Sequence, residues 1–265
     1  MLSQILTFIF FVLIGLEIRE GLSKPKDAAL PAIAALGGMA LPALIFIALI
    51  PDSKAWAVAM PTDVALAIGA LSLLGKRVNP AVRLFLLTLA VADDFFSLVV
   101  IGIFFREDLH LASAIYTLGA AAIGFIMPMR HRLISVLSPI ATFVIIPIYI
   151  FINLLTKLDF SMSTEKISIA VVIARVVGKV VGITLFTYLC TRFTVLRLPP
   201  ALDLKEIVGV GFLAGMGLTV SLVIAEITLQ TESELSQVRM GLFFAAIASG
   251  LCGVLWLKRF PVSLQ

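Results

Sequence analysis

Residues Leu89–Val100 read LAVADDFFSLVV, a stretch in which two adjacent carboxylates, Asp93 and Asp94, interrupt an apolar run. Nothing beside them in this run carries a positive charge or an amide that would solvate a carboxylate. Ionisable residues in such surroundings are expensive, and they are retained where they have a function. The doublet therefore raises two questions: whether this chain lies in a membrane, and what function the two carboxylates have there.

The composition indicates an integral membrane protein. Of the 265 residues, 61% are hydrophobic and 14% are charged. The mean hydropathy is +1.14, which leaves too little polar material to cover a soluble globule. Apolar runs long enough to cross about 30 Å of hydrocarbon recur from end to end. The sequence therefore predicts an all-α polytopic membrane protein, with a single membrane domain over residues 1–265.

Several function classes fit the sequence poorly. The net charge is +4, but the basic residues are dispersed over short loops, so nucleic acid is not an expected partner. The two cysteines, Cys190 and Cys252, lie in apolar runs, which argues against a disulfide framework or a zinc site. Two adjacent aspartates suit neither a metal-dependent prenyltransferase nor an intramembrane aspartyl protease, whose acids are spaced differently. We expect a secondary transporter rather than an enzyme, without a cofactor.

Nine membrane spans are predicted, at about residues 3–22, 28–50, 55–75, 80–105, 109–129, 135–156, 166–190, 205–228 and 237–258. The basic residues between them alternate in density, and the sparse side holds Lys54, Arg106, Lys157, Lys166 and Arg239. Two more, Arg175 and Lys179, lie within a span, and all the others lie on the dense side. Because basic loops stay in the cytoplasm, we expect an outside N-terminus and a cytoplasmic C-terminus.

In this orientation spans two to four and spans seven to nine run in opposite senses. We therefore predict inverted repeats at about residues 28–105 and 166–258, with 3–22 and 109–156 as additional or interface helices. The middle span of each repeat is interrupted, by AMPTD (Ala59–Asp63) and by GVGFLAGMG (Gly209–Gly217). Paired broken, crossing helices indicate a transport site near the midplane. The alternative is that Pro61 only kinks a helix and the glycines only allow close packing.

Four ionisable residues within these spans point to one site: Asp63, Asp93, Asp94 and Lys179. Adjacent residues of a helix project about 100° apart, so one aspartate can meet a cation while the other meets Lys179. Burial disfavours the charged form of each group and an opposite charge favours it, which permits proton exchange near neutral pH. A transient Na⁺ prefers oxygen ligands, which Asp94, the Thr62 hydroxyl and carbonyls of a broken helix can provide. Competition of cation and protons for these oxygens is sufficient for exchange.

Other roles stay open for several of these residues. Asp93 and Lys179 can form a buried ion pair that only locks two helices. Asp63 can neutralise the ends of the broken helices or bind the cation directly. Arg175 lies one turn from Lys179 and can either snorkel to the interface or pair with a carboxylate.

Six segments resemble the NhaA-type sodium/proton antiporter family, in the family's order and over nearly the whole chain. They are GLEIREGL (Gly15–Leu22), PAIAALGGMALPAL (Pro31–Leu44), PTDVALAIGALSLLGKRV (Pro61–Val78), LFLLTLAVADD (Leu84–Asp94), VVGKVVGI (Val176–Ile183) and VGFLAGMGLTVSLVIA (Val210–Ala225). The resemblance implies that Asp94 is the principal cation ligand and proton carrier and that Asp93 pairs with Lys179. It places Thr62 and Asp63 at the crossing of the broken helices.

The resemblance also implies electrogenic exchange of one Na⁺ or Li⁺ for two H⁺ in a bacterial inner membrane, serving pH homeostasis, with a regulatory role for Glu17. The chain is shorter than the family's usual twelve spans: it begins at what looks like the second and lacks about two more between residues 109–129 and 135–156. The missing first span carries the family's dimerisation hairpin, which leaves the oligomeric state open. Two rival interpretations are a same-fold transporter of another solute and a transport-inactive relative that acts as an interaction protein.

Overall fold

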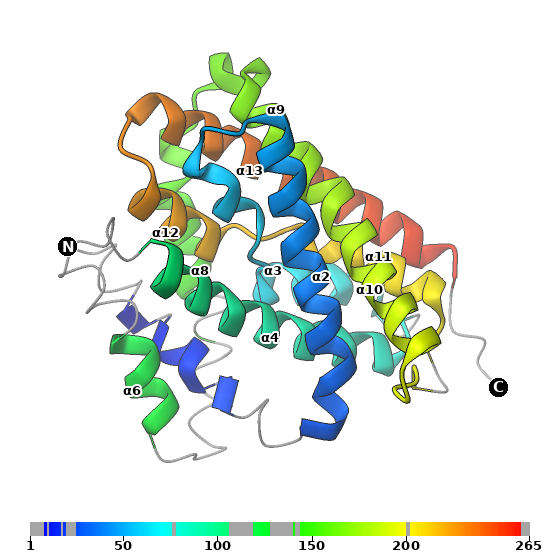
Figure 1. Cartoon of the computed structure of the whole chain (residues 1–265). Helices are drawn as coiled ribbons and strands as arrows, with labels where there is room; N and C mark the ends of the chain where they lie inside the picture. The colour runs from blue at the N-terminus through cyan, green and yellow to red at the C-terminus, as the bar shows by residue number, and fades with distance from the viewer. Residues whose placement is uncertain are drawn as a thin grey trace.

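The computed structural model describes residues 8–9, 11–16, 18–19, 25–75, 78–105, 119–127, 140, 144–199 and 202–260. Within these ranges the chain forms helices and no strands. Figure 1 shows the long helices packed side by side, with shorter interrupted helices between them. The prediction of an all-α polytopic protein is confirmed.

Between Pro25 and Lys258 the described chain has fourteen helical elements with defined bounds. They are α2 (Pro25–Leu49), η1 (Lys54–Ala59), α3 (Val64–Ser72), α4 (Pro80–Phe104), α6 (Ala120–Ile126), α8 (Ile146–Asn153), η5 (Leu155–Lys157), η6 (Phe160–Thr164), α9 (Lys166–Ile173), η7 (Ala174–Gly178), α10 (Lys179–Phe193), α11 (Leu204–Ala214), α12 (Thr219–Thr228) and α13 (Glu232–Lys258). The elements α9, η7 and α10 follow one another without a break, and η7 is a π-helical turn between them. Such turns are rare and occur frequently at functional sites.

Five helical segments of the described chain are long and apolar enough to cross a membrane: Ala28–Leu49, Lys54–Ser72, Pro80–Phe104, Lys166–Phe193 and Glu232–Lys258. A sixth span results when α11 and α12, which are bent by 49° relative to each other, are counted as one. These six correspond to predicted spans two, three, four, seven, eight and nine. The other three predicted spans, at 3–22, 109–129 and 135–156, lie partly outside the described residues, and the described part of the last is a short apolar helix, Ile146–Lys157.

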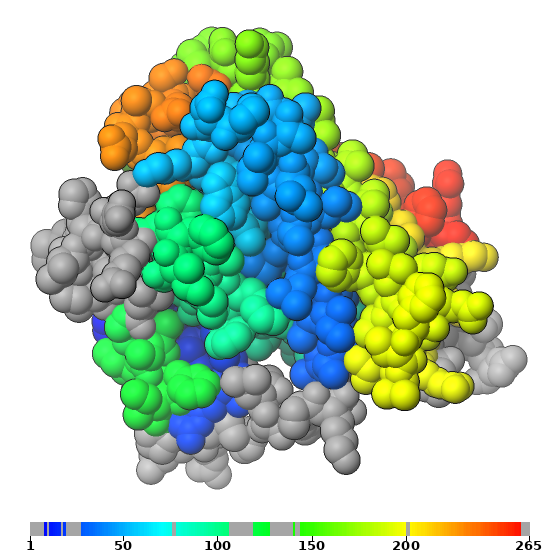
Figure 2. All heavy atoms as spheres, viewed as in Figure 1, coloured from blue at the N-terminus to red at the C-terminus, as the bar shows by residue number. Residues whose placement is uncertain are grey.

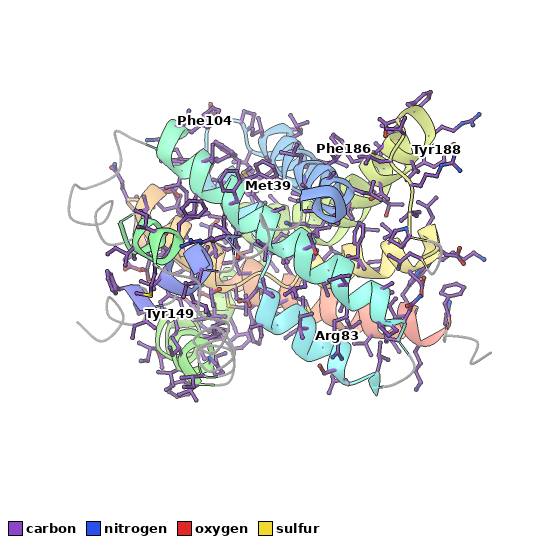
Figure 3. The ribbon with its side chains drawn as sticks, turned by 90° about the horizontal axis from the view of Figure 1, so that it is seen from below. Met39, Arg83, Phe104, Tyr149, Phe186 and Tyr188 are labelled. Atoms are coloured by element: carbon purple, nitrogen blue, oxygen red, sulfur yellow. The ribbon has the colours of Figure 1, made fainter. Side chains whose placement is uncertain are left out.

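The outer surface of the bundle is apolar. Large hydrophobic side chains are exposed on several long helices, among them Leu44 of α2, Phe104 of α4 and Leu251 of α13. Figure 3 shows Phe104 and Tyr188 at the outer edge of the bundle, whereas the buried Met39 lies toward its middle. An exposed apolar surface of this extent is what a bilayer would cover.

Helices α2 and α10 pack along their length, and they are adjacent in Figures 1 and 2. Glycines permit this approach. A Cβ atom on Gly182 would collide with the carbonyl oxygen of Gly37, and one on Gly178 would lie 2.8 Å from the Cα of Pro42. Close backbone packing through small residues is the usual way in which membrane helices associate. Gly178 and Gly182 therefore allow η7 and α10 to pack closely against α2.

Residues 8–9, 11–16 and 18–19 are helical, and this segment lies against α6. A Cβ on Gly15 would collide with the carbonyl oxygen of Ala121, and one on Gly124 with that of Val12. Arg19 Nη1 donates to the carbonyl oxygens at the C-terminal end of α6, including that of Ile126 at 3.1 Å. A cation at this end is favourable because the terminal carbonyls of a helix are negative. Glu17, the predicted regulatory residue, lies outside the described residues.

Candidate functional site

The first interruption lies between η1 and α3, where residues 60–63 are not helical. Pro61 lacks a backbone N–H and restricts the residue before it, so a helix is not continued here. Asp63 restarts the helix because its Oδ1 accepts hydrogen bonds from Ala65 N at 3.1 Å and Leu66 N at 3.2 Å. A carboxylate at this position caps the N-terminus of α3 and meets its positive end.

The second interruption lies between α11 and α12, at residues 215–218, and it contacts the first. A Cβ on Gly217 would collide with Arg175 Nη2 and with the carbonyl oxygen of Pro61, so the approach of the two breaks requires a glycine. Thr219, the first residue of α12, donates to Asp63 Oδ2 through its hydroxyl at 2.8 Å and through its backbone N at 3.4 Å. One carboxylate therefore binds the starts of both broken helices.

Arg175 joins the two breaks from η7. Its side chain is completely buried, and within the described chain it donates only to uncharged oxygens. On the first broken span it bonds the carbonyl oxygens of Val58 at 2.7 Å and Pro61 at 2.6 Å. On the second it bonds the carbonyl oxygen of Gly215 at 3.2 Å and the Ser221 hydroxyl at 2.7 Å. These carbonyls lose their helical partners where the spans are interrupted, and the planar guanidinium group has enough donors to satisfy them.

Lys179 lies one turn further along, at the start of α10, and is also completely buried. Its Nζ is 2.9 Å from Asp93 Oδ2 and 3.0 Å from Thr62 Oγ1, and it also donates to the carbonyl oxygen of Met60. The contact expected between Asp93 and Lys179 is therefore present. It connects α4, α10 and the first break through one ammonium group.

The two aspartates occupy the buried side of α4. Asp93 is 0% exposed and Asp94 is 4% exposed. Only one carboxylate oxygen of Asp93 contacts Lys179, and among the described residues no group hydrogen bonds to the other, Oδ1. Thr62, at 1% exposure, adds a hydroxyl oxygen at the edge of the break. Carboxylate and hydroxyl oxygens of this kind suit a small hard cation.

Of the predicted site residues, Lys179 contacts both Asp93 and Thr62. Asp94 is adjacent to Asp93 on α4, and Asp63 lies three residues from Met60 in the same break. No group of three or more His, Cys, Asp or Glu side chains that could hold a resident metal ion occurs in the part of the chain that the structure describes. The buried charged groups near the breaks are three carboxylates, of Asp63, Asp93 and Asp94, and two cations, Arg175 and Lys179. The arrangement is suited to bind and release a monovalent cation and protons.

Sequence reasoning did not assign Thr219 or Ser221, and it left Arg175 between two roles that both differ from the observed one. A signal was present in each case. Thr219 directly follows the glycine-rich break, where a helix must restart and its N–H groups need an acceptor. Arg175 is placed one turn before Lys179, on the side that must face the same interruption.

Comparison with known proteins places these residues in a family context. A model of the family described as Na⁺/H⁺ antiporter 1 matches residues 1–135 and, in a second and overlapping segment, residues 117–257. The Na⁺/H⁺ antiporter NhaA 2 of Aliarcobacter butzleri is 31% identical, over 95% of this chain and 80% of the relative. The NhaA antiporter of Actinobacillus pleuropneumoniae serotype 7 is 30% identical over 94% of this chain and 80% of its own length. That of Salmonella paratyphi B is 29% identical over 97% and 82%.

These alignments also show that the chain is shortened internally. The alignment with the Aliarcobacter protein spans 318 residues, whereas this chain has 265. Some residues of the relative must therefore lie opposite gaps in this chain. The two family matches overlap within residues 117–135, which is where a shortening would divide them. The prediction of a shortened member is confirmed, and a loss of spans between residues 109–129 and 135–156 stays a prediction.

Proposed function

Since the chain belongs to the Na⁺/H⁺ antiporter 1 family, we propose that it exchanges a cytoplasmic Na⁺ or Li⁺ for external protons at Asp93 and Asp94. One observation carries the proposal: a fully buried Asp93–Lys179 pair lies against the two interrupted helices. An interior charge pair of this kind has no need to sit beside unwound backbone if it only locks two helices. Beside a break, it has carbonyl and hydroxyl oxygens within reach.

The charges of the site explain the competition. Three buried carboxylates, Asp63, Asp93 and Asp94, face two buried cations, Arg175 and Lys179. With all five ionised, the site carries an excess negative charge that either Na⁺ or H⁺ can neutralise. A cation held by Asp94 and Thr62 also repels the Lys179 ammonium group, which favours release of a second proton from the Asp93–Lys179 pair. Exchange of one cation for two protons would be electrogenic, driven by about 2.3 kcal/mol per net charge per 100 mV.

Alternating access would follow from movement between two inverted repeats, at about residues 28–105 and 166–258. Each repeat contributes one interrupted span, and the breaks meet at Asp63 and Arg175. We assign the Asp63 carboxylate to fixing the starts of α3 and α12 at this meeting point; a direct contact with the cation remains a prediction. We also propose a bacterial inner-membrane protein, with the N-terminus outside and the C-terminus in the cytoplasm.

Proton flux in sealed proteoliposomes tests the proposal. The wild-type protein is expected to move protons on addition of Na⁺ or Li⁺. Asp94→Asn is expected to reduce the flux to background, because it removes the principal carboxylate. Asp52→Asn is the control, since Asp52 is exposed in the loop after α2. Equal flux in Asp94→Asn and wild type would place the site elsewhere.

Competition has its own signature in the same assay. Each unit of decrease in pH should raise the apparent KM for Na⁺ by up to about tenfold for one competing proton, and saturating Na⁺ should restore the rate.

The internal shortening favours a second candidate, a transport-inactive relative that serves as an interaction protein. Wild-type protein that is silent for Na⁺, Li⁺ and K⁺ at every pH would support that candidate.

A further inference from the structure

Ser97 of α4 is one of three serine and threonine hydroxyls that are buried without a hydrogen-bond partner among the described residues; the other two are Thr184 and Ser249. Of the three, Ser97 is the one that lies on the helix of the aspartate doublet. Several other helical hydroxyls donate to the backbone carbonyl four residues earlier, as do Ser72 to Ile68 at 2.7 Å, Thr88 to Leu84 at 2.9 Å, Thr187 to Ile183 at 2.7 Å and Thr228 to Ile224 at 2.8 Å. The Ser97 hydroxyl makes no such bond, and no other group among the described residues is its partner. The side chain is nevertheless 2% exposed. Burying a hydroxyl without a hydrogen-bond partner normally costs free energy of desolvation. A ligand that binds to the hydroxyl would offset this cost.

The position of Ser97 relative to the aspartates indicates which ligand. Residues of a helix project about 100° apart, so with Asp93 at the origin Asp94 projects at about 100° and Ser97, one turn later, at about 40°. Ser97 therefore projects between the two carboxylates. All three belong to the buried side of α4. On the other side of the doublet the residue that projects in between is Ala90, which has no side-chain oxygen.

A second unfilled position lies on the same side of the helix. Asp93 Oδ1 is buried and has no hydrogen-bond partner among the described residues, whereas Asp93 Oδ2 is held by Lys179. A serine hydroxyl carries one donor hydrogen and two lone pairs, and it rotates to suit its neighbour. It can thus direct a lone pair to a cation or its hydrogen to a carboxylate oxygen.

We propose that Ser97 is a further ligand of the transported cation and thereby a determinant of cation selectivity. The inference rests on the proposed function and names an additional oxygen at the same site. In the cation-loaded protein Ser97 Oγ coordinates the ion together with the carboxylates. In the proton-loaded protein the hydroxyl turns its hydrogen toward a carboxylate oxygen of the doublet. Because a larger cation needs more ligands to replace its water, Na⁺ depends on this oxygen more than Li⁺ does.

The test compares Ser97→Ala with wild type in cation binding and in exchange. Direct binding is measured by titration calorimetry of the purified protein with NaCl or LiCl, and KM by proton flux in proteoliposomes. Loss of one ligand oxygen should raise both Kd and KM for Na⁺ by about three- to tenfold and those for Li⁺ by less. Ser97→Thr keeps the hydroxyl and should remain within about twofold of wild type.

The matched control is Thr88→Val on the same helix. Its hydroxyl already has a backbone partner, so both constants should be unchanged. An unaltered Na⁺ affinity in Ser97→Ala, or an equal rise of the constants for Na⁺ and Li⁺, overturns the inference about Ser97. The proposed function is still supported in that case if wild type exchanges Na⁺ for protons and Asp94→Asn does not. A wild-type protein that neither binds Na⁺ nor exchanges it overturns both. Equal unfolding temperatures of Ser97→Ala and wild type show that a change in affinity is not a change in folding.

Discussion

Two neighbouring regions of the protein treat their buried polar groups in opposite ways. At the meeting of the breaks, Arg175 makes four hydrogen bonds and both oxygens of Asp63 are bonded. On the adjoining side of α4, Asp93 Oδ1 and Ser97 Oγ have no hydrogen-bond partner within the described chain. A satisfied buried network rigidifies a fold, whereas an unsatisfied buried group carries a free-energy penalty that a bound ligand can relieve. We infer that the first region is a fixed frame and that the second is the place of the proposed exchange.

The two regions therefore have different roles, and both depend on the two breaks lying against each other. The frame satisfies carbonyl and N–H groups that the interruptions leave without helical partners. The proposed exchange site on α4 lies next to this frame, which holds the breaks in place beside it. Substitutions in the frame should reduce stability first, and substitutions on α4 should reduce exchange first.

The largest effect is expected from Arg175→Met. It leaves three carbonyls and the Ser221 hydroxyl without their donor, in a completely buried position. We expect a loss of about 3 to 5 kcal/mol in the free energy of unfolding, measured by denaturant titration in detergent. Arg175→Lys keeps the charge but not the planar set of donors, so it should recover only part of this loss.

Arg83→Met is the control for the frame, because Arg83 is an exposed arginine on α4. It should change the free energy of unfolding by less than about 0.5 kcal/mol. If Arg175→Met and Arg83→Met unfold alike, the guanidinium does not hold the breaks together, and the contrast between the two regions is lost.

The next effect concerns the pair that connects the two regions. Asp93→Asn and Lys179→Met each leave the other charge buried without its partner at 2.9 Å, and each should cost about 3 kcal/mol. The double variant removes both charges and should cost less than the sum of the single variants. Unfolding of all three variants under one condition measures the coupling, and additive losses would show that the pair contributes no stability.

A smaller effect is expected from Gly217→Ala. The added methyl group would collide with Arg175 Nη2 and the carbonyl oxygen of Pro61, so the breaks must separate. Overpacking of this kind costs about 1 to 3 kcal/mol. In Gly69→Ala the new Cβ meets nothing within 4 Å in the middle of α3, and replacing a helical glycine should stabilise by about 0.5 to 1 kcal/mol. The same sign for both variants would contradict a close contact at Gly217.

The spans and the Asp93–Lys179 contact were accessible from the sequence because both depend on strong local constraints. An apolar run of sufficient length has to span the membrane, and a buried carboxylate needs a counter-charge, for which Lys179 was the leading candidate. The extended segment at Pro61 was equally accessible, because proline cannot continue the helix. The sequence did not decide the contacts of Asp63. A carboxylate directly after a helix break can neutralise the helix ends or bind a cation, and the sequence is the same in both cases.

The sequence by itself thus determined an all-helical membrane chain, the interruption at Pro61 and the buried ionisable residues that need a partner. It placed the second interruption too broadly, at Gly209–Gly217, because residues 209–214 continue α11 and the break lies at 215–218. Only the tertiary structure decided which groups are the partners of the buried residues. Arg175 reaches Val58 across 117 residues, and Asp63 reaches Thr219 across 156. The physical reason is that hydrophobic length and buried charge act along each helix, whereas hydrogen-bond partners at a break are set by how separate helices pack against one another.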